Sequence, residues 1–570
     1  MSKHVPSSVA AVVALALSVS AAPPPPASSP TATAPATMPT TAPLIPPSTT
    51  RPQPNVRFPW SPDQRDGTYR NPIICADYSD PDVVRDGQDY WLVASSFTCT
   101  PALPILHSRD LVNWTIVNHA VRNLPDPRGL FHTVRHGEGV WAPAIRKHAG
   151  KFWIFFPMPD EGIYVTTADD PRGKWSEPHL LVAGKGLIDP CPLWDDDGKA
   201  YLVHAYARSR AGIKDILRVR PMAPDASKLL GEGQVVYSDP PGQPTLEGPK
   251  FLKRDGWYYI SAPAGGVATG WQLILRSRNV FGPYEPKKVL EQGPTPINGP
   301  HQGAIVDTPD GNQWWFVHFQ DADAYGRITH LQPVTWQDGW PLMGTDTDGN
   351  GVGEPVLKHA KPRVSGDVPP AVPPAVPQTS DDFEGEVLAL QWQWQANHSP
   401  DWASLSARKG SIRLPAVPAP ANLADVPSLL LQKLPAREFS VETKVELTAT
   451  SPAVQAGLAM IGAKHAALVV QPAEGGGARV ALLVNNEPVA TMPAEGRALR
   501  LRIQVRDGGI CTFAVAGEGG PFAPIGGTFQ ATPGRWVGAK VGIFCRSTDP
   551  AAAPESNHAD FDYFRFAATE

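Results

Sequence analysis

The segment DGQDYWLVASS, residues 86–96, is the first of five similar segments that decide the fold. The others are AGKFWIFFP (149–157), DGKAYLVHA (197–205), DGWYYISAP (255–263) and DGNQWWFVHF (310–319). Each begins with a tight-turn dipeptide and continues into an apolar, aromatic-rich run that is typical of a buried strand. The turn glycines recur every 48–63 residues. Short strands repeated at such a period predict a β-propeller with one blade per copy, and therefore five blades. A β-sandwich with coincidental hairpins is the alternative.

The C-terminal part of the chain shows a different strand pattern. Segments such as FSVETKVEL (439–447) and ALRLRIQV (498–505) alternate apolar and polar residues, as strands of a sandwich do. The predicted fold class is therefore all-β, with a five-bladed β-propeller followed by a β-sandwich (jelly-roll) domain.

Two Pro-rich stretches and an apolar N-terminus predict the domain boundaries. Lys3 precedes an apolar run at 9–19 and small residues at 20–22, which is the layout of a signal peptide. A retained anchor is the alternative. We expect an exported protein, periplasmic or extracellular, with no membrane span in the mature chain, because no later apolar run approaches ~18 residues. The predicted parts are a signal peptide (1–22), a Pro/Thr-rich tether (23–57), a catalytic propeller (58–362), a Pro-rich linker (363–380) and an accessory sandwich (381–570).

Charge and cysteine content exclude several classes of protein. The 50 basic and 55 acidic residues give a formal charge of −5, which argues against a nucleic-acid partner. The five cysteines form no CxxC motif or Cys/His cluster, so a zinc site is not expected. Cys511 and Cys545 lie in candidate strands and could pair in an oxidising compartment, but sequence cannot give their distance.

Five residues occupy equivalent places seven to ten positions ahead of the turn glycines. They are Asp80, Trp141, Asp189, Glu247 and His301. The segment before each turn is expected to be the innermost strand of its blade, lining the central channel. Three carboxylates at matched positions of a repeat are therefore expected to point at one axis.

Three convergent carboxylates in an aromatic-rich channel suit glycoside hydrolysis. An inverting glycosidase needs one carboxylate as a general base and one carboxylic acid, with a raised pKa, as a general acid. A third carboxylate nearby can keep that pKa high by like-charge repulsion. The sequence has no GxSxG, Walker, GxGxxG or HExxH motif that would support another chemistry.

Several motifs resemble glycoside hydrolase family 43 across the whole predicted propeller. They are NPIICADYSDPDVVRDGQDYWLVASSF (71–97), GVWAP (139–143), LIDPCPLWDDDGKAYL (187–202), LEGPKFLKRDGWYYI (246–260) and YGRITHLQPVTWQDGW (325–340). The resemblance implies a five-bladed propeller of inverting enzymes, among them β-xylosidases, α-L-arabinofuranosidases, arabinanases and galactanases. It also implies that Asp80 is the general base, Asp189 the pKa modulator and Glu247 the general acid. Asp82 departs from the residue commonly found there, and we expect it to be structural.

The same resemblance implies secondary roles. Phe97 and Trp141 are similar to the hydrophobic walls of the first sugar pocket, with core packing as the alternative. Arg327 aligns with an arginine that hydrogen-bonds the sugar, or it forms a plain salt bridge. His301 resembles a channel histidine that ligates a calcium ion through waters, or it is a satisfied channel histidine. The loop DTDGNG (346–351) matches half of a calcium loop, and a polar turn is the alternative. No cofactor is expected to be required for the chemistry.

The predicted function is exo-acting, inverting release of xylose or arabinose from plant-cell-wall polysaccharide or oligosaccharide, as in xylan degradation. A galactan- or arabinan-active glycosidase and a non-catalytic sugar-binding propeller are the alternatives. The C-terminal domain resembles the concanavalin-like domain that narrows the active-site pocket of β-xylosidase-type members, with a free carbohydrate-binding module as the alternative. The choice between xylose and arabinose stays open.

Overall fold

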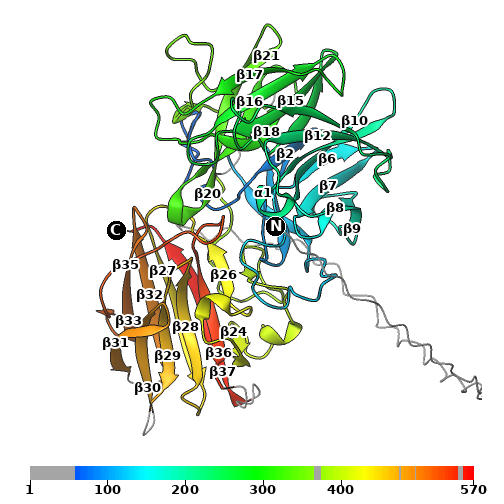
Figure 1. Cartoon of the computed structure of the whole chain (residues 1–570). Coiled ribbons are helices and arrows are strands. Elements are labelled where there is room, and N and C mark those ends of the chain that lie inside the picture. Colours follow the sequence, from blue (N-terminus) through cyan, green and yellow to red (C-terminus); the bar gives the residue numbers. More distant parts are fainter. Residues whose placement is uncertain (1–57, 365–373, 474–476, 495, 550–555, 570) are drawn as a thin grey trace, which may run out of the picture. The chain divides into compact units, whose positions relative to one another are not determined.

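Five four-stranded antiparallel sheets form the N-terminal part of the chain, coloured from blue to green in Figure 1. The computed structural model describes residues 58–364, 374–473, 477–494, 496–549 and 556–569. The predicted signal peptide and tether lie outside the described residues. All described residues belong to one unit, Ile45–Glu570.

Each sheet contains four consecutive strands and corresponds to one repeat of the sequence, so the predicted five-bladed propeller is confirmed. The first blade contains β2 (Asp82–Asp86), β3 (Asp89–Val93), β4 (Ala102–Ser108) and β5 (Thr115–Val121). The second contains β6 (Ala144–His148), β7 (Lys151–Met158), β8 (Gly162–Ala168) and β9 (His179–Ala183). The third contains β10 (Leu187–Trp194), β11 (Ala200–Tyr206), β12 (Ile216–Met222) and β13 (Gln234–Ser238). The fourth contains β14 (Lys250–Arg254), β15 (Trp257–Ala264), β16 (Trp271–Ser277) and β17 (Glu285–Leu290). The fifth contains β18 (His301–Asp307), β19 (Trp314–Asp321), β20 (Arg327–Gln337) and β21 (Trp340–Met343).

The first strand of each blade lines the central channel. Each of these strands contacts the first strand of the next blade, and β18 contacts β2, which completes the ring. The five turn glycines join the first and second strands and all have positive φ, a conformation that glycine adopts without a steric penalty. The segment ahead of each turn is therefore the innermost strand, as the repeat predicts.

Residues from the two ends of the propeller pair with each other. β1 (Thr68–Arg70) forms an antiparallel sheet with β22 (Lys358–Ala360). Ile74 also forms a backbone bridge with Thr329 of the fifth blade. These pairings connect the segment that leads into the first blade with the fifth blade and the strand that follows it.

Two packed sheets form the C-terminal part, coloured from yellow to red in Figure 1, as the sandwich prediction requires. The eight-stranded sheet has the order β23-β26-β36-β28-β29-β30-β31, with β25 beside β36. Its strands are β23 (Gln393–Trp394), β25 (Val417–Pro418), β26 (Leu430–Lys433), β28 (Val454–Ile461), β29 (His465–Pro472), β30 (Ala478–Val484), β31 (Glu487–Ala494) and β36 (Lys540–Ser547). The seven-stranded sheet has the order β24-β37-β27-β32-β33-β34, with β35 beside β33. Its strands are β24 (Ile412–Pro415), β27 (Phe439–Thr448), β32 (Ala498–Arg506), β33 (Ile510–Gly517), β34 (Ala523–Pro524), β35 (Phe529–Gln530) and β37 (His558–Ala567).

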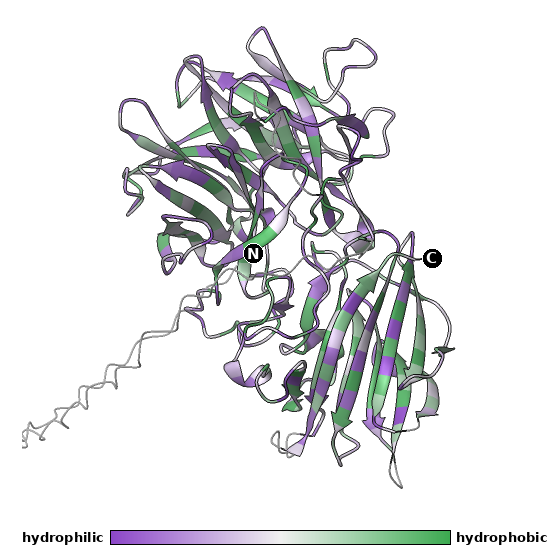
Figure 2. Cartoon of the chain, turned by 180° about the vertical axis from the view of Figure 1, so that it is seen from behind, coloured by the Kyte–Doolittle hydropathy of each residue, from purple (hydrophilic) through white to green (hydrophobic). Residues whose placement is uncertain are grey.

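Alternating burial along the strands explains why this part folds as a sandwich. In β27 and β32 every second side chain is buried, and Figure 2 shows the matching bands of hydrophobic and hydrophilic residues. The inward residues of both sheets join one core. All five cysteines are buried and free. Cys511 and Cys545 lie in different sheets, so the disulfide considered from the sequence is not formed.

The fifth blade packs directly into the core of the sandwich. Ala324 and Tyr325, in the short helix η1 (Asp323–Tyr325), belong to the same buried cluster as the sandwich strands. The Tyr325 hydroxyl donates to the carbonyl of Arg437 at 2.8 Å and accepts from the N–H of Gly509 at 2.9 Å. The two domains are therefore joined by packing as well as by the linker.

The remaining helices are short. They are α1 (Arg208–Ala211), η2 (Pro400–Trp402) and η3 (Leu423–Asp425). Among the described residues, no helix has the length and apolar content needed to cross a membrane.

Candidate active site

The three carboxylates lie at the start of the first strands of blades one, three and four. Asp80 precedes β2, Asp189 lies in β10, and Glu247 precedes β14. Asp80 and Asp189 have left-handed φ values of 55° and 56°, which aspartate tolerates better than most residues. At Asp189 the pairing of β10 with β11 shifts register, so the residue bulges out of the ladder. Because the first strands surround one channel, their equivalent ends bring these side chains together.

Three donors surround the carboxylate of Asp80, which is only 3% exposed. The hydroxyls of Ser79 and Ser95 each donate to Oδ2 at 2.6 Å. Arg327 donates from Nη1 to Oδ1 at 2.9 Å. All three neighbours donate, which is the arrangement that suits an ionised carboxylate.

Asp189 and Glu247 are linked through the backbone of Gly248. The N–H of Gly248 donates to Asp189 Oδ2 at 2.8 Å. Gly248 has a φ of 60°, and a Cβ at this position would lie 2.9 Å from the side chain of Gln302. Glycine is therefore required beside the glutamate. Glu247 Oε1 lies 3.1 Å from Nε2 of the fully buried His301, a hydrogen bond in which the imidazole or the protonated acid is the donor.

Burial and nearby negative charge raise the pKa of Asp189. Burial contributes most, the charge of Glu247 adds to the rise and the Gly248 N–H opposes it, and the resulting pKa is about 7. Asp189 therefore keeps its proton up to about pH 7. Glu247 is the more exposed partner, at 28% of its side chain against 4% for the whole of Asp189, so it is the group that a substrate can reach.

Replacing Asp189 by asparagine is expected to stabilise the protein at pH 8 and to leave its stability nearly unchanged at pH 4. The folded-state pKa of about 7 lies above the ordinary value of 3.8, so the wild-type protein loses stability as the pH rises through this window. Asparagine cannot ionise, yet it still accepts from Gly248. We expect a gain of about 1–3 kcal/mol in the free energy of unfolding at pH 8, measured by urea denaturation.

A substitution at an exposed carboxylate provides the control for this experiment. The side chain of Asp169 is 84% exposed, and Asp169→Asn is expected to change stability equally little at both pH values. An Asp189→Asn variant whose difference from wild type is the same at pH 4 and pH 8 would contradict the raised pKa.

Residues of both domains form an aromatic cluster around Trp141, which occupies the place in blade two that the carboxylates occupy in blades one, three and four. The Trp536 ring, in the loop between β35 and β36, lies edge-on to Trp141 at 4.7 Å and 6.5 Å from Phe97. Phe97 and Trp141 are 6.3 Å apart. The guanidinium of Arg210, in α1, lies 5.0 Å from the Trp141 ring and 5.7 Å from the Trp536 ring. We call these four residues the aromatic wall.

A buried aspartate connects the loop of Trp536 to the carboxylates. Asp77 Oδ2 accepts from the N–H of Gly538 at 2.9 Å, and its Oδ1 accepts from the N–H of Arg327 at 2.9 Å. Arg327 in turn binds Asp80. The sandwich loop is thus attached to the same arginine that holds the predicted base.

Asp82 has only structural contacts, as expected from the sequence. It is fully buried, and its Oδ2 accepts from the Ile145 N–H at 2.7 Å and from Arg146 at 2.6 Å. Arg146 also donates to the sulfur of Cys191. This network joins the first strands of the first three blades.

The residues around His301 do not offer a protein ligand set for calcium. Calcium takes six to eight oxygen ligands, whereas His301 offers one unpartnered nitrogen, Nδ1. Among the described residues, no three His, Cys, Asp or Glu side chains are grouped so that they could hold a metal ion. In the loop 346–351, Asp346 accepts from the N–H groups of Gly349 and Gly351, as in a polar turn. The channel calcium therefore stays a prediction, and no catalytic step is assigned to it.

Several residues of the site were not singled out from the sequence. Ser95 lies in the motif 71–97 that also contains Asp80 and Phe97, so the sequence offered a local signal for it. Trp536 and Arg210 had none, because Trp536 lies in a loop of the sandwich and Arg210 in the short helix α1 of the third blade. Among the seven residues that the sequence nominated, hydrogen bonds and charge interactions link Asp80, Asp189, Glu247, His301 and Arg327, and a separate ring contact links Phe97 with Trp141.

Comparisons with known proteins identify relatives of both domains. The family model of glycosyl hydrolases family 43 matches residues 69–341, and the model of the β-xylosidase C-terminal concanavalin A-like domain matches residues 380–567. A Xylanibacter ruminicola protein, provisionally named as a β-xylosidase, is 45% identical over 392 residues, covering 68% of this chain and 70% of its own. A non-reducing end α-L-arabinofuranosidase of Bacteroides ovatus is 29% identical, covering 88% of this chain and 94% of its own. The crystal structure of a xylan β-1,4-xylosidase from Bacillus halodurans, 26% identical, superposes with a TM-score of 0.75, covering 87% of this chain and 99% of that one.

Proposed function

The chain belongs to glycosyl hydrolase family 43, and we propose that it is an exo-acting, inverting enzyme that releases xylose or arabinose from plant-cell-wall polysaccharide or oligosaccharide. It is a glycoside hydrolase of the β-xylosidase and α-L-arabinofuranosidase type. The single observation that carries the finer proposal is the grouping of three carboxylates, in which the charges of Glu247 and Asp80 both act on the buried Asp189.

In the proposed reaction, Asp80 is the general base. Its carboxylate takes a proton from a water molecule, and the water oxygen forms a bond to the anomeric carbon. Arg327, Ser79 and Ser95 hold the carboxylate in position. Glu247 gives its proton to the glycosidic oxygen as the bond to the leaving group breaks. Because water attacks from the face opposite to the leaving group, the sugar is released with inverted configuration.

The burial of Asp189 supports its role as the residue that keeps Glu247 protonated. The negative charge of Glu247 helps to raise the pKa of Asp189, and the same repulsion makes it costly for both carboxyls to be ionised together; His301 positions the acid through its Nε2. We infer that kcat/KM falls as the pH rises above about 7, where Asp189 ionises.

The exo action rests on the aromatic wall. Trp536 comes from the sandwich and packs against Trp141 of the propeller, so we propose that the sandwich closes one side of the sugar site. A closed side admits one terminal sugar and excludes an internal segment of a polysaccharide. This arrangement is better explained by an accessory domain that shapes the site than by a free carbohydrate-binding module.

Hydrolysis of xylotriose and of nitrophenyl glycosides tests the proposal. We expect xylose and xylobiose as the first products, with measurable rates on nitrophenyl β-D-xylopyranoside, α-L-arabinofuranoside or both, and little on β-D-galactopyranoside. Trp536→Ala is expected to raise KM for xylotriose by about tenfold through lost sugar contacts, with a smaller change in kcat. Lys409→Met, at an exposed position of the sandwich, serves as the matched control.

Each alternative has its own outcome in this assay. Release of galactose, or of arabinose oligomers from arabinan, would favour a galactan- or arabinan-active enzyme. Sugar binding without any hydrolysis would favour a non-catalytic propeller. We also propose that the protein is exported, on the basis of the apolar run at 9–19 and the small residues that follow it.

A further inference from the structure

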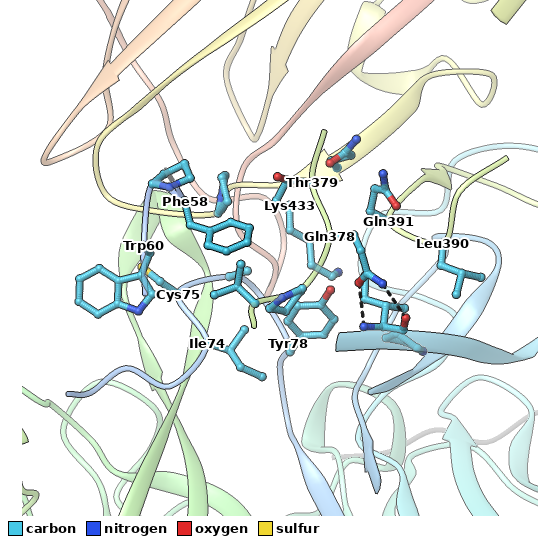
Figure 3. A pocket seen from close by; sticks show the side chains of 18 of the residues that line it. Phe58, Trp60, Ile74, Cys75, Tyr78, Gln378, Thr379, Leu390, Gln391 and Lys433 are labelled. Atoms are coloured by element: carbon cyan, nitrogen blue, oxygen red, sulfur yellow. Dashed lines mark hydrogen bonds between the residues drawn. The ribbon is translucent and has the colours of Figure 1, made fainter. Parts of the chain in front are cut away.

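A small cavity lies where the first blade, the end of the linker and the sandwich meet (Figure 3). Its volume is about 40 Å³. Tyr78, which lines it, stands two residues ahead of Asp80 in the chain. Gln378 of the linker closes one side, donating to the Ile116 carbonyl at 3.0 Å and accepting from its N–H at 2.9 Å. The cavity has no part in the proposed hydrolysis.

The wall of the cavity is mostly apolar. Phe58, Trp60, Ile74, Tyr78 and Leu390 line it from several directions, as Figure 3 shows. A site of this kind favours a ligand with a hydrophobic part over a fully hydrated inorganic ion.

The cavity is also lined by polar groups that have no hydrogen-bond partner. Gln432 is 2% exposed, and neither its amide nitrogen nor its amide oxygen has a hydrogen-bond partner. The buried Nδ1 of His119 has none either. Both residues line the cavity. Buried polar atoms of this kind are normally satisfied, so a ligand or ordered water is expected beside them.

Among the described residues that line the cavity, Lys433 has the only ammonium or guanidinium group, and its charge is only partly compensated. Its one hydrogen bond within the described part of the chain is long, 3.3 Å to Oε1 of Gln393, and it lies 5.2 Å from the ring of Tyr78. No carboxylate of the described residues lies within ion-pair distance of it. The more distant negative charge of Asp77 partly compensates it, and the positive charge of Lys540, its pairing partner between β26 and β36, acts in the opposite direction. Burial lowers the pKa of Lys433, which measures the cost of leaving this cation without an anion.

We propose that this cavity binds a small monocarboxylate with a short apolar tail. The carboxylate would accept from the free N–H groups of Lys433 and from the amide of Gln432, and the tail would contact the apolar wall. A volume of about 40 Å³ has room for a few water-sized groups, which excludes a sugar ring or an aromatic acid. Propionate has the required charge, size and tail.

Thermal denaturation of the full chain in sodium propionate tests this site. Sodium chloride at equal ionic strength is the control. We expect a saturable rise of about 1–3 °C in the melting midpoint with propionate and none with chloride. Lys433→Met is expected to abolish the rise, and its melting midpoint without ligand is expected to equal or exceed that of the wild type, because a buried unpaired cation is removed. The exposed-site control Lys409→Met is expected to respond like the wild type.

Three results would overturn the proposal: no saturable rise in the wild-type protein, an equal rise with chloride, or a rise that persists in Lys433→Met. The first would mean that ordered water alone fills the cavity, and the second that any anion suffices. If Lys433→Met does not fold, Gln432→Leu provides the second variant. It is expected to weaken propionate binding by about tenfold, read by saturation-transfer NMR, and unchanged binding would count against the site.

Discussion

Asp80→Asn is expected to lower kcat/KM by about 10²–10⁴-fold on every substrate, whatever its leaving group. The asparagine keeps the shape of the side chain but cannot take a proton from water. Activated nitrophenyl glycosides and natural oligosaccharides need the same attacking water, so both are expected to lose activity alike. Steady-state kinetics on nitrophenyl β-D-xylopyranoside and xylobiose measure the two losses side by side.

Ser95→Ala is the matched control for this prediction. It removes one of the two serine hydroxyls that donate to Asp80 Oδ2 but leaves the base and its contact with Arg327. We expect a loss of about tenfold, equal for both substrates. A loss as large as that of Asp80→Asn would assign the effect to disturbed packing instead of to the base.

The configuration of the first product decides the role of Asp80 independently of rates. Inversion requires a base that activates water, so proton NMR of the first-formed sugar is expected to show the anomer opposite to that of the substrate. Retention would make Asp80 a nucleophile that forms a covalent glycosyl intermediate. The assignment of Asp80 as a base would then be wrong, although the carboxylate would still be essential.

The blades and the three carboxylates were predictable because both follow a local repeat. A turn glycine followed by an apolar run marks each blade, and the segment seven to ten positions ahead of that glycine contains the channel end of its first strand. Asp80, Asp189 and Glu247 all lie in this segment, so their convergence followed from the architecture and needed no knowledge of long-range contacts. The alternation of FSVETKVEL likewise predicted the sandwich, because a strand in which every second side chain is apolar has one buried face and one exposed face.

The pairing of side chains across domains could not be predicted in this way. Arg327 and Asp80 are separated by 247 positions, and no periodicity connects them. Trp536 lies in an irregular loop whose position depends on how η1 packs into the sandwich core. The cavity at Lys433 is formed by three segments that meet only in the folded protein. Contacts of this kind depend on tertiary packing, which local sequence patterns do not predict.

Glu247→Gln is expected to separate substrates by their leaving groups. An alcohol such as the second sugar of xylobiose leaves only if its oxygen is protonated, whereas a dinitrophenolate leaves without help. The variant is therefore expected to lose about 10²–10⁴-fold in kcat/KM on xylobiose and less than about tenfold on a dinitrophenyl xyloside. Glutamine retains an oxygen for the contact with His301, so the loss reports the missing proton more than a missing hydrogen bond.

The pH dependence provides the second half of this test. With a natural substrate, the wild-type rate is expected to fall above about pH 7, where Asp189 ionises. In Glu247→Gln with the dinitrophenyl substrate no proton is donated, so this alkaline decline is expected to disappear. In Asp189→Asn the repulsion between the two carboxyls is gone, and the decline is expected to move to lower pH. If the alkaline decline is unchanged in Glu247→Gln, another residue must be the proton donor. The buried Asp189 would be the first candidate, because its pKa is about 7.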